Sequence, residues 1–171
     1  LHPGLATGFM NWRGAQQHRD ALRDFARSNS VGVITRDRDP GTVSIDRSGE
    51  PVVKYRLSDY DAAHLHTGIV GAASILEAAG AQRIYSGHQA GVSFEPGVRG
   101  SLAEFDAAAK KAGYGPGQCS MGALHIMGSA RMGGSPELSA TDPDGVTWEV
   151  SNIVVADGSS FPTAPGVNPM V

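Results

Sequence analysis

The stretch "SDYDAAHLHTGIVGAASILEAAG" (Ser58 to Gly80) carries the clearest helix signals in this sequence. Its hydrophobic residues recur at intervals of three or four, which predicts one buried helical face: Leu65, Ile69, Ala72 and Leu76. Ser58 and Asp61 have the spacing of a capping box, in which a serine side chain satisfies the first free backbone N–H groups. Gly80 suits the left-handed residue that ends many helices. The stretch therefore predicts a helix that packs on one side.

Two more segments show helical signals. "SLAEFDAAAKKAG" (101–113) repeats the arrangement, with Ser101 and Glu104 as a second capping box and Gly113 at the end. Upstream, residues Ala15 to Ser28 predict a first helix with Leu22 and Phe25 on one face.

Between these helices the sequence predicts strands. "VGVITRD" (31–37) is rich in β-branched residues, and "GTVSIDRSGEPVVKYRL" (41–57) indicates a hairpin whose second strand opens at Pro51. "AQRIYSGH" (81–88) and "SNIVVAD" (151–157) predict two further short strands. Hairpins followed by helices predict an α+β fold, an antiparallel sheet with helices on one face.

Composition narrows the function classes. The chain has 171 residues and a net charge of −3, so no basic field favours nucleic acid or an anionic membrane. The single Cys119 excludes an internal disulfide and a cysteine-rich metal site. His64 and His66 are spaced two apart, which cannot place both on one metal from a helix, so no metal site is predicted. No hydrophobic run approaches the roughly 20 residues that cross a bilayer, and location stays open between cytoplasm and membrane association.

The stretch "HIMGSARMGG" (125–134) is the first candidate for chemistry. A lone histidine among hydrophobic residues is most often a core residue. The glycines at 128, 133 and 134 permit positive φ and close backbone approach, so that a flat ring or a phosphate can lie against the main chain. His125 beside such a surface could take a proton near neutral pH, because the reference pKa of histidine is about 6.5. His88, in "SGHQAG", favours a structural or surface role.

The second candidate is "SNIVVADGSSFPTAPGVNPM" (151–170). Asp157 and Gly158 follow a hydrophobic run, a position that suits contacts to a ribose or ribityl hydroxyl and to pyrophosphate. Asn168 precedes Pro169, which favours an extended backbone, and its amide can orient a substrate hydroxyl. The alternative reading of each is a plain turn.

Together these stretches resemble the C-terminal end of the glucose–methanol–choline (GMC) family of flavoprotein oxidoreductases. The resemblance lies in four elements in the family's order: "HIMGSARMGG", "ATDPDGVTWEV", "NIVVADGSSFPT" and "GVNPM". "RIYSGH" and the last 29 residues before Val171 are most similar to the long-chain fatty alcohol oxidase branch. The resemblance implies FAD as cofactor, a small-molecule alcohol as substrate, and oxygen or another electron acceptor.

The resemblance also implies residue roles. His125 would be the base that takes the alcohol proton, and Asn168 would hydrogen-bond the alcohol oxygen. Asp157 and Gly158 would contact the ribityl and pyrophosphate portion of FAD, with Pro169 and Met170 close to the isoalloxazine. The reaction expected is oxidation of a primary, hydrophobic alcohol to the aldehyde, with hydride transfer to flavin N5.

One departure from the family pattern shapes the domain prediction. No Gly-x-Gly-x-x-Gly follows a strand anywhere in the chain. We therefore expect residues 1–145 to be part of a substrate-binding domain and residues 146–171 to return to an FAD-binding domain whose N-terminal, Rossmann-type half lies elsewhere in the same protein. The chain alone is then expected neither to hold FAD tightly nor to turn over. The alternatives are a sterol- or choline-type relative and a non-catalytic α+β interaction module.

Overall fold

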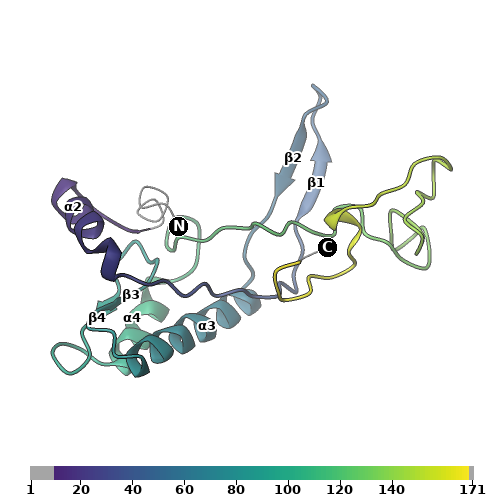
Figure 1. Cartoon of the computed structure of the whole chain (residues 1–171). Coiled ribbons are helices and arrows are strands. Elements are labelled where there is room, and N and C mark those ends of the chain that lie inside the picture. Colours follow the sequence, from purple (N-terminus) through teal and green to yellow (C-terminus); the bar gives the residue numbers. More distant parts are fainter. Residues whose placement is uncertain (1–9, 170–171) are drawn as a thin grey trace. The chain divides into compact units, whose positions relative to one another are not determined.

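The structure is a computed structural model that describes residues 10–169 (Figure 1). The chain divides into two compact units, which are described separately. Unit 1 holds residues 10–35 and 62–122 of the described part, and unit 2 holds residues 36–61 and 123–169. None of the helices formed by residues 10–169 is both long enough and apolar enough to cross a membrane.

Unit 1 contains most of the helical structure. Its strands β3 and β4 pair antiparallel, with Ile84 opposite Phe94. Helix α3 begins at the end of the first segment of unit 2, residues 36–61, and continues in unit 1. The elements are α2 (Ala15–Asp24), η1 (Phe25–Arg27), α3 (Asp59–Ala78), β3 (Ile84–Tyr85), β4 (Ser93–Phe94) and α4 (Leu102–Ala112).

The predicted capping boxes are confirmed at both helices. The Ser101 hydroxyl accepts the backbone N–H of Glu104 at 3.3 Å, and Gly113 follows the last residue of α4 with φ of 78°. At α3 the Ser58 hydroxyl accepts the N–H of Asp61 at 3.1 Å and donates to its carboxylate at 2.9 Å. Local side-chain chemistry therefore sets where both helices start.

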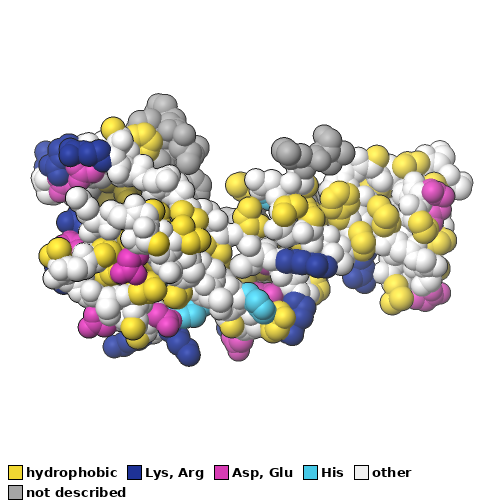
Figure 2. Space-filling model, turned by 60° about the horizontal axis from the view of Figure 1, so that its bottom comes forward, with side chains coloured by type: hydrophobic (Ala, Val, Ile, Leu, Met, Phe, Trp, Pro, Cys, Tyr) yellow, Lys and Arg dark blue, Asp and Glu magenta, His cyan; other side chains and the backbone are white. Residues whose placement is uncertain are grey.

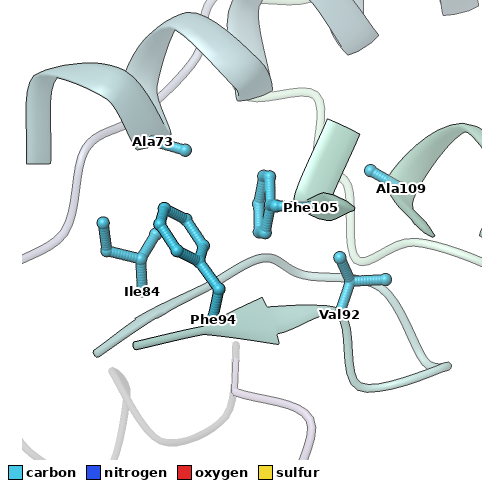
Figure 3. Close-up of a cluster of buried hydrophobic side chains, with 6 residues drawn as sticks. All are labelled: Ala73, Ile84, Val92, Phe94, Phe105 and Ala109. Atoms are coloured by element: carbon cyan, nitrogen blue, oxygen red, sulfur yellow. The ribbon is translucent and has the colours of Figure 1, made fainter. Parts of the chain in front are cut away.

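The core of unit 1 lies where α3 and α4 cover the β3–β4 pair (Figure 3). Phe94 and Phe105 are each only 2% exposed, and their ring centroids lie 5.4 Å apart in a tilted arrangement. Four smaller side chains complete the cluster: Ala73, Ile84, Val92 and Ala109. On α3 the buried residue of this face is Ala73, one position from the predicted Ala72, and Ile69 and Leu76 pack against the cluster from the side.

Unit 2 contains the predicted hairpin. Strand β1 (Thr42–Ile45) pairs antiparallel with β2 (Pro51–Lys54), and Pro51 opens the second strand as expected. The turn is held by the Asp46 carboxylate, which accepts the backbone N–H groups of Ser48 and Glu50. Since residues opposite each other in a ladder share a face, Val43, Val53 and Ile45 lie on one side of the hairpin, where all three are exposed.

The remainder of unit 2 is mostly loop. Its one further helical element in the described residues is the 3₁₀ turn η2 (Gly158–Ser160). Isolated bridges join Thr141 to Thr147 and Val146 to Val154, so the "ATDPDGVTWEV" stretch forms no regular ladder.

Two strand predictions were wrong. Residues 31–37 form no strand, because no described segment pairs with them and Val31 and Ile34 stay exposed. Residues 151–157 contribute a single bridge at Val154 rather than a strand. β-branched composition favours an extended chain, but a strand also needs a hydrogen-bonding partner. The α+β class itself is confirmed, with antiparallel strands in two separate two-stranded sheets.

Candidate functional site

The turn η2 is the structural centre of the candidate site in unit 2. Asp157 is its N-cap residue, and its Oδ1 atom accepts the backbone N–H of Ser159 at 2.8 Å and the Ser159 hydroxyl. The hydroxyl of buried Ser160 donates to the backbone oxygen of Asp157 at 2.8 Å. Hydrogen bonds from the Ser159 hydroxyl and N–H hold the pKa of the Asp157 carboxyl below its usual range. Asp157 is therefore a charged, exposed residue that shapes its own turn.

The glycine-rich loop after His125 lies against this turn. The backbone N–H of Ala130 donates to the Ser159 oxygen at 3.0 Å, and that of Met132 donates to the Ser160 oxygen at 2.8 Å. The two stretches singled out in the sequence are thus joined through their main chains.

Two glycines allow the approach. A Cβ atom at Gly158 would lie 3.3 Å from the backbone oxygen of Ile126, and one at Gly128 would lie 3.4 Å from that of Phe161. Gly128 also has φ of 77°, a backbone conformation that residues other than glycine rarely adopt. At these two glycines the group that lies close to the backbone is therefore another segment of the chain: the His125 loop packs against the Asp157 turn.

His125 itself is exposed, at a bend that opens the loop, so it is not a core residue. Its neighbours Leu124 and Ile126 are 87% and 75% exposed. No described residue hydrogen-bonds the His125 ring. The His125 imidazole is therefore accessible from outside, next in sequence to two exposed hydrophobic residues.

The last candidate residues lie on the segment after η2. Asn168 is exposed and Pro169 is half-buried, whereas Met170 lies outside the described residues. The segment is held within unit 2 by Arg36, whose guanidinium donates to the Thr163 hydroxyl at 2.9 Å. No hydrogen bond joins Asn168 to His125. The structure therefore links the His125 loop to the Asp157 turn directly, and shows no hydrogen bond between Asn168 and His125.

The chemistry of this donor set fits one side of an FAD site. It offers an imidazole, an amide, a carboxylate and exposed hydrophobic side chains, and a flat, partly apolar ring system binds to groups of that kind. Hydrophobic side chains are visible at the surface in Figure 2, in keeping with the many exposed hydrophobic residues of this chain. The contribution of Ser159 and Ser160 was missed in the sequence. An aspartate followed two residues later by serine is a known turn signal that could have indicated it.

A second polar cluster, in unit 1, was also missed. His66 on α3 hydrogen-bonds the Tyr114 hydroxyl through Nδ1 at 2.8 Å and Asp106 on α4 through Nε2 at 2.7 Å. Since a carboxylate only accepts, Nε2 donates to Asp106, while Nδ1 pairs with the Tyr114 hydroxyl. Burial, with Cys119 and Asp106 nearby, raises the pKa of Tyr114 to about 12. The cluster therefore ties α3 to α4 and keeps Tyr114 a neutral phenol.

His88 lies beside this cluster and is completely buried, so of the two roles predicted for it the surface role is wrong and the structural role fits. Its Nδ1 pairs with the Ser86 hydroxyl at 2.7 Å, and its ring meets that of Tyr114 edge-on with centroids 4.9 Å apart. Nε2 has no hydrogen-bond partner among residues 10–169. Burial, and then the nearby His66, lower the pKa of His88. The fold therefore holds this imidazole neutral.

The lowered pKa of His88 predicts a dependence of stability on pH. In the unfolded chain the imidazole takes up a proton near pH 6.5, whereas in the folded chain it does so only at lower pH. Its contribution to stability is therefore complete above about pH 6.5 and is lost as the pH falls through the folded-state pKa. We expect the free energy of unfolding, measured with urea, to fall less between pH 7.5 and pH 5 in His88→Phe than in wild type.

The control for this experiment is His18→Phe, because His18 is only partly buried and lies on α2 against the Trp12 ring. The comparison uses the change with pH and not the stability itself, since His88→Phe also removes the hydrogen bond to Ser86. An equal pH dependence in His88→Phe and wild type would contradict a buried neutral imidazole.

Comparison with known proteins extends these observations. The family model described as GMC oxidoreductase matches residues 37–171. The chain is 37% identical over 174 residues to the long-chain-alcohol oxidase FAO4A of Arabidopsis thaliana and 30% identical over 179 residues to FAO1 of the same plant. Each alignment covers 100% of this chain and 23% of the relative. An uncharacterized GMC-type oxidoreductase of Mycobacterium tuberculosis is 32% identical, over 99% of this chain and 25% of that protein.

One relative has a higher sequence identity over a shorter alignment. This relative is a 2-methyl-1,2-propanediol dehydrogenase of Mycolicibacterium austroafricanum, which is 51% identical over 45 residues. The alignment covers 26% of this chain and 8% of the relative. The chain spans about a quarter of the length of the curated relatives it matches over its whole length. No solved structure matches it.

Proposed function

This chain belongs to the GMC oxidoreductase family, and from that membership we propose that it is the C-terminal part of an FAD-dependent enzyme that oxidises a primary, hydrophobic alcohol to the aldehyde. The proposal takes its substrate class from the long-chain-alcohol oxidases to which the chain is similar along its whole length. On this proposal the 171 residues are one part of a longer enzyme, and the other part of the same polypeptide lies outside them.

The observation that carries the proposal is the position of His125. It stands exposed at the start of a loop that the Asp157 turn holds by two backbone hydrogen bonds, and its neighbours in sequence, Leu124 and Ile126, are exposed too. A base that must meet an alcohol at a defined point has to be both accessible and fixed. The exposed hydrophobic neighbours suit the alkyl chain of the substrate.

The proposed roles follow from the chemistry of each side chain. An imidazole nitrogen of His125 takes the hydroxyl proton, and the Asn168 amide donates a hydrogen bond to the alcohol oxygen, which becomes more basic as the proton leaves. The bound FAD supplies the acceptor for the hydride that leaves the carbinol carbon. The substrate thus loses one proton and one hydride and becomes the aldehyde.

The cofactor contacts are part of the proposal. Asp157 and Gly158 would meet the ribityl and pyrophosphate portion of FAD, and Pro169 and Met170 the ring. Residues 146–171 would complete an FAD-binding domain that the preceding part of the same polypeptide provides, whereas residues 1–145 would belong to the substrate-binding domain. The α+β interaction module without catalysis is disfavoured by the family membership.

The test compares the complete polypeptide with the 171-residue chain. Purified without added cofactor, the complete polypeptide is expected to show a bound-flavin spectrum, and the chain alone is expected to show none after gel filtration. Mixed anaerobically with a long-chain primary alcohol, the complete polypeptide is expected to lose its oxidised-flavin absorbance, faster than with ethanol at the same concentration.

Two outcomes would contradict the proposal. Flavin bound tightly to the isolated chain would refute the division of the cofactor site, and a flavin that no primary alcohol reduces would refute the reaction. Admission of oxygen then separates an oxidase, whose flavin is reoxidised at once, from a dehydrogenase, the class named in the relative that aligns with 45 residues of this chain. The oligomeric state and the cellular location are left open by the proposal.

A further inference from the structure

We propose that Asp157 is a positioning residue for His125: by capping η2 it fixes the turn to which the His125 loop is hydrogen-bonded. The inference rests on the proposed function for the role of His125, and on the geometry of unit 2 for the role of Asp157. It differs from a cofactor contact, because a cap acts through the folded loop and requires no flavin.

The first step is the cap. The Oδ1 atom of Asp157 already accepts two donors, the N–H and the hydroxyl of Ser159. The backbone oxygen of Asp157 accepts two more, the N–H of Ser160 at 3.1 Å and its hydroxyl at 2.8 Å. Without the carboxylate, the first free N–H group of a three-residue turn loses its partner, and so short a turn has little else to hold it.

The second step is the attachment of the loop. The carbonyl groups that accept the Ala130 and Met132 N–H groups are those of Ser159 and Ser160, which belong to the turn that Asp157 caps. Closer to the histidine, Gly158 lies against the Ile126 backbone so tightly that a methyl group there would stand 3.3 Å from its oxygen.

The position of the His125 ring depends on its backbone. Its ring has no hydrogen-bond partner among the described residues, and its own position is exposed. The backbone on its C-terminal side, held through Ile126 and Ala130, is therefore what defines where the imidazole stands. Displacement of a catalytic group by about 1 Å costs up to about 100-fold in rate.

The competing role for Asp157 is a charged contact to the flavin. The two roles make different demands on the side chain. A cap needs one oxygen that accepts a hydrogen bond, which Asp157→Asn keeps and Asp157→Ala removes. A contact that depends on the negative charge is lost in both variants.

The first part of the experiment uses the 171-residue chain without cofactor and measures amide hydrogen exchange by NMR. In Asp157→Ala, the Ala130 and Met132 amides are expected to exchange about 2- to 30-fold faster, the range that loss of an N-cap hydrogen bond predicts. In Asp157→Asn they are expected to exchange close to the wild-type rate. Asp46→Ala is the matched control, because Asp46 caps the β1–β2 turn in the same manner.

The second part uses the complete polypeptide and measures the rate of flavin reduction at saturating alcohol, together with flavin content. We expect Asp157→Ala to reduce the rate per bound flavin about 10- to 100-fold, and Asp157→Asn to recover most of that loss. Asp46→Ala is expected to leave the rate unchanged.

Each result decides the inference. Wild-type exchange at Ala130 and Met132 in Asp157→Ala would overturn it, as would faster exchange without any loss of rate. Loss of flavin in both Asp157 variants, with normal exchange, would assign the residue to the cofactor contact. A wild-type flavin that no alcohol reduces would refute the proposed function, while the exchange measurement would still decide whether Asp157 holds the loop.

Discussion

Replacement of His125 by alanine in the complete polypeptide is expected to slow flavin reduction by a saturating long-chain alcohol by about 10²–10⁴-fold. General-base removal has this size because the alcohol must then lose its proton to water during hydride transfer. The exposed position of His125 indicates that the fold does not depend on the ring, so the loss should fall on the chemical step. The measurement is anaerobic stopped-flow reduction, followed at the oxidised-flavin absorbance.

Two further measurements would distinguish a catalytic base at position 125 from a residue with a structural role. Added imidazole should partly restore the rate of His125→Ala, since a small base can occupy the vacated space. His18→Ala is the control, because it makes the same change on α2 of unit 1 and should leave the rate within about twofold. A loss smaller than tenfold in His125→Ala would remove His125 from the base role.

Phe105→Ala is expected to lower the free energy of unfolding by about 3–5 kcal/mol, the range for truncation of a buried aromatic side chain. Phe105 is 2% exposed and lies 5.4 Å from the Phe94 ring at the centre of the only buried hydrophobic cluster of the described residues (Figure 3). So small a core has few other contacts to compensate for the cavity. Urea denaturation followed by far-ultraviolet circular dichroism reports the loss through α3 and α4.

The matched control is Val98→Ala in the same unit. Val98 is 81% exposed, and its truncation should change the free energy of unfolding by less than about 0.5 kcal/mol. Should Phe105→Ala cost no more than Val98→Ala, the cluster would not be the core that stabilises unit 1.

The sequence predicted best what local chemistry decides. Both capping boxes, the glycine ends of the helices and the hairpin with Pro51 depend on residues within a few positions of one another, and the structure has them as expected. The strand predictions for residues 31–37 and 151–157 were wrong because strand formation depends on a partner elsewhere in the chain, which composition does not reveal.

In the candidate site, too, local patterns were predictable and long-range contacts were not. The glycine-rich loop and the Asp157 segment were recognisable as patterns, but their mutual hydrogen bonds through Ala130 and Met132 were not. The pairing of His66 with Tyr114, 48 positions apart, carried no sequence signal at all. Contacts of this kind are made by the fold, and a single sequence does not state which distant residues meet.

The exposed face of the β1–β2 hairpin has a practical consequence for work with this chain. Val43, Ile45 and Val53 form a bare β-branched surface on two strands that no third described strand covers. Surfaces of this type recruit other chains edge to edge and favour aggregation. Lys54 at one end and Pro51 at the other oppose such stacking, since a charge and a missing N–H both interrupt a growing sheet. Purified on its own, the chain should therefore be kept dilute, and a lysine at position 45 would be the first substitution to keep it in solution.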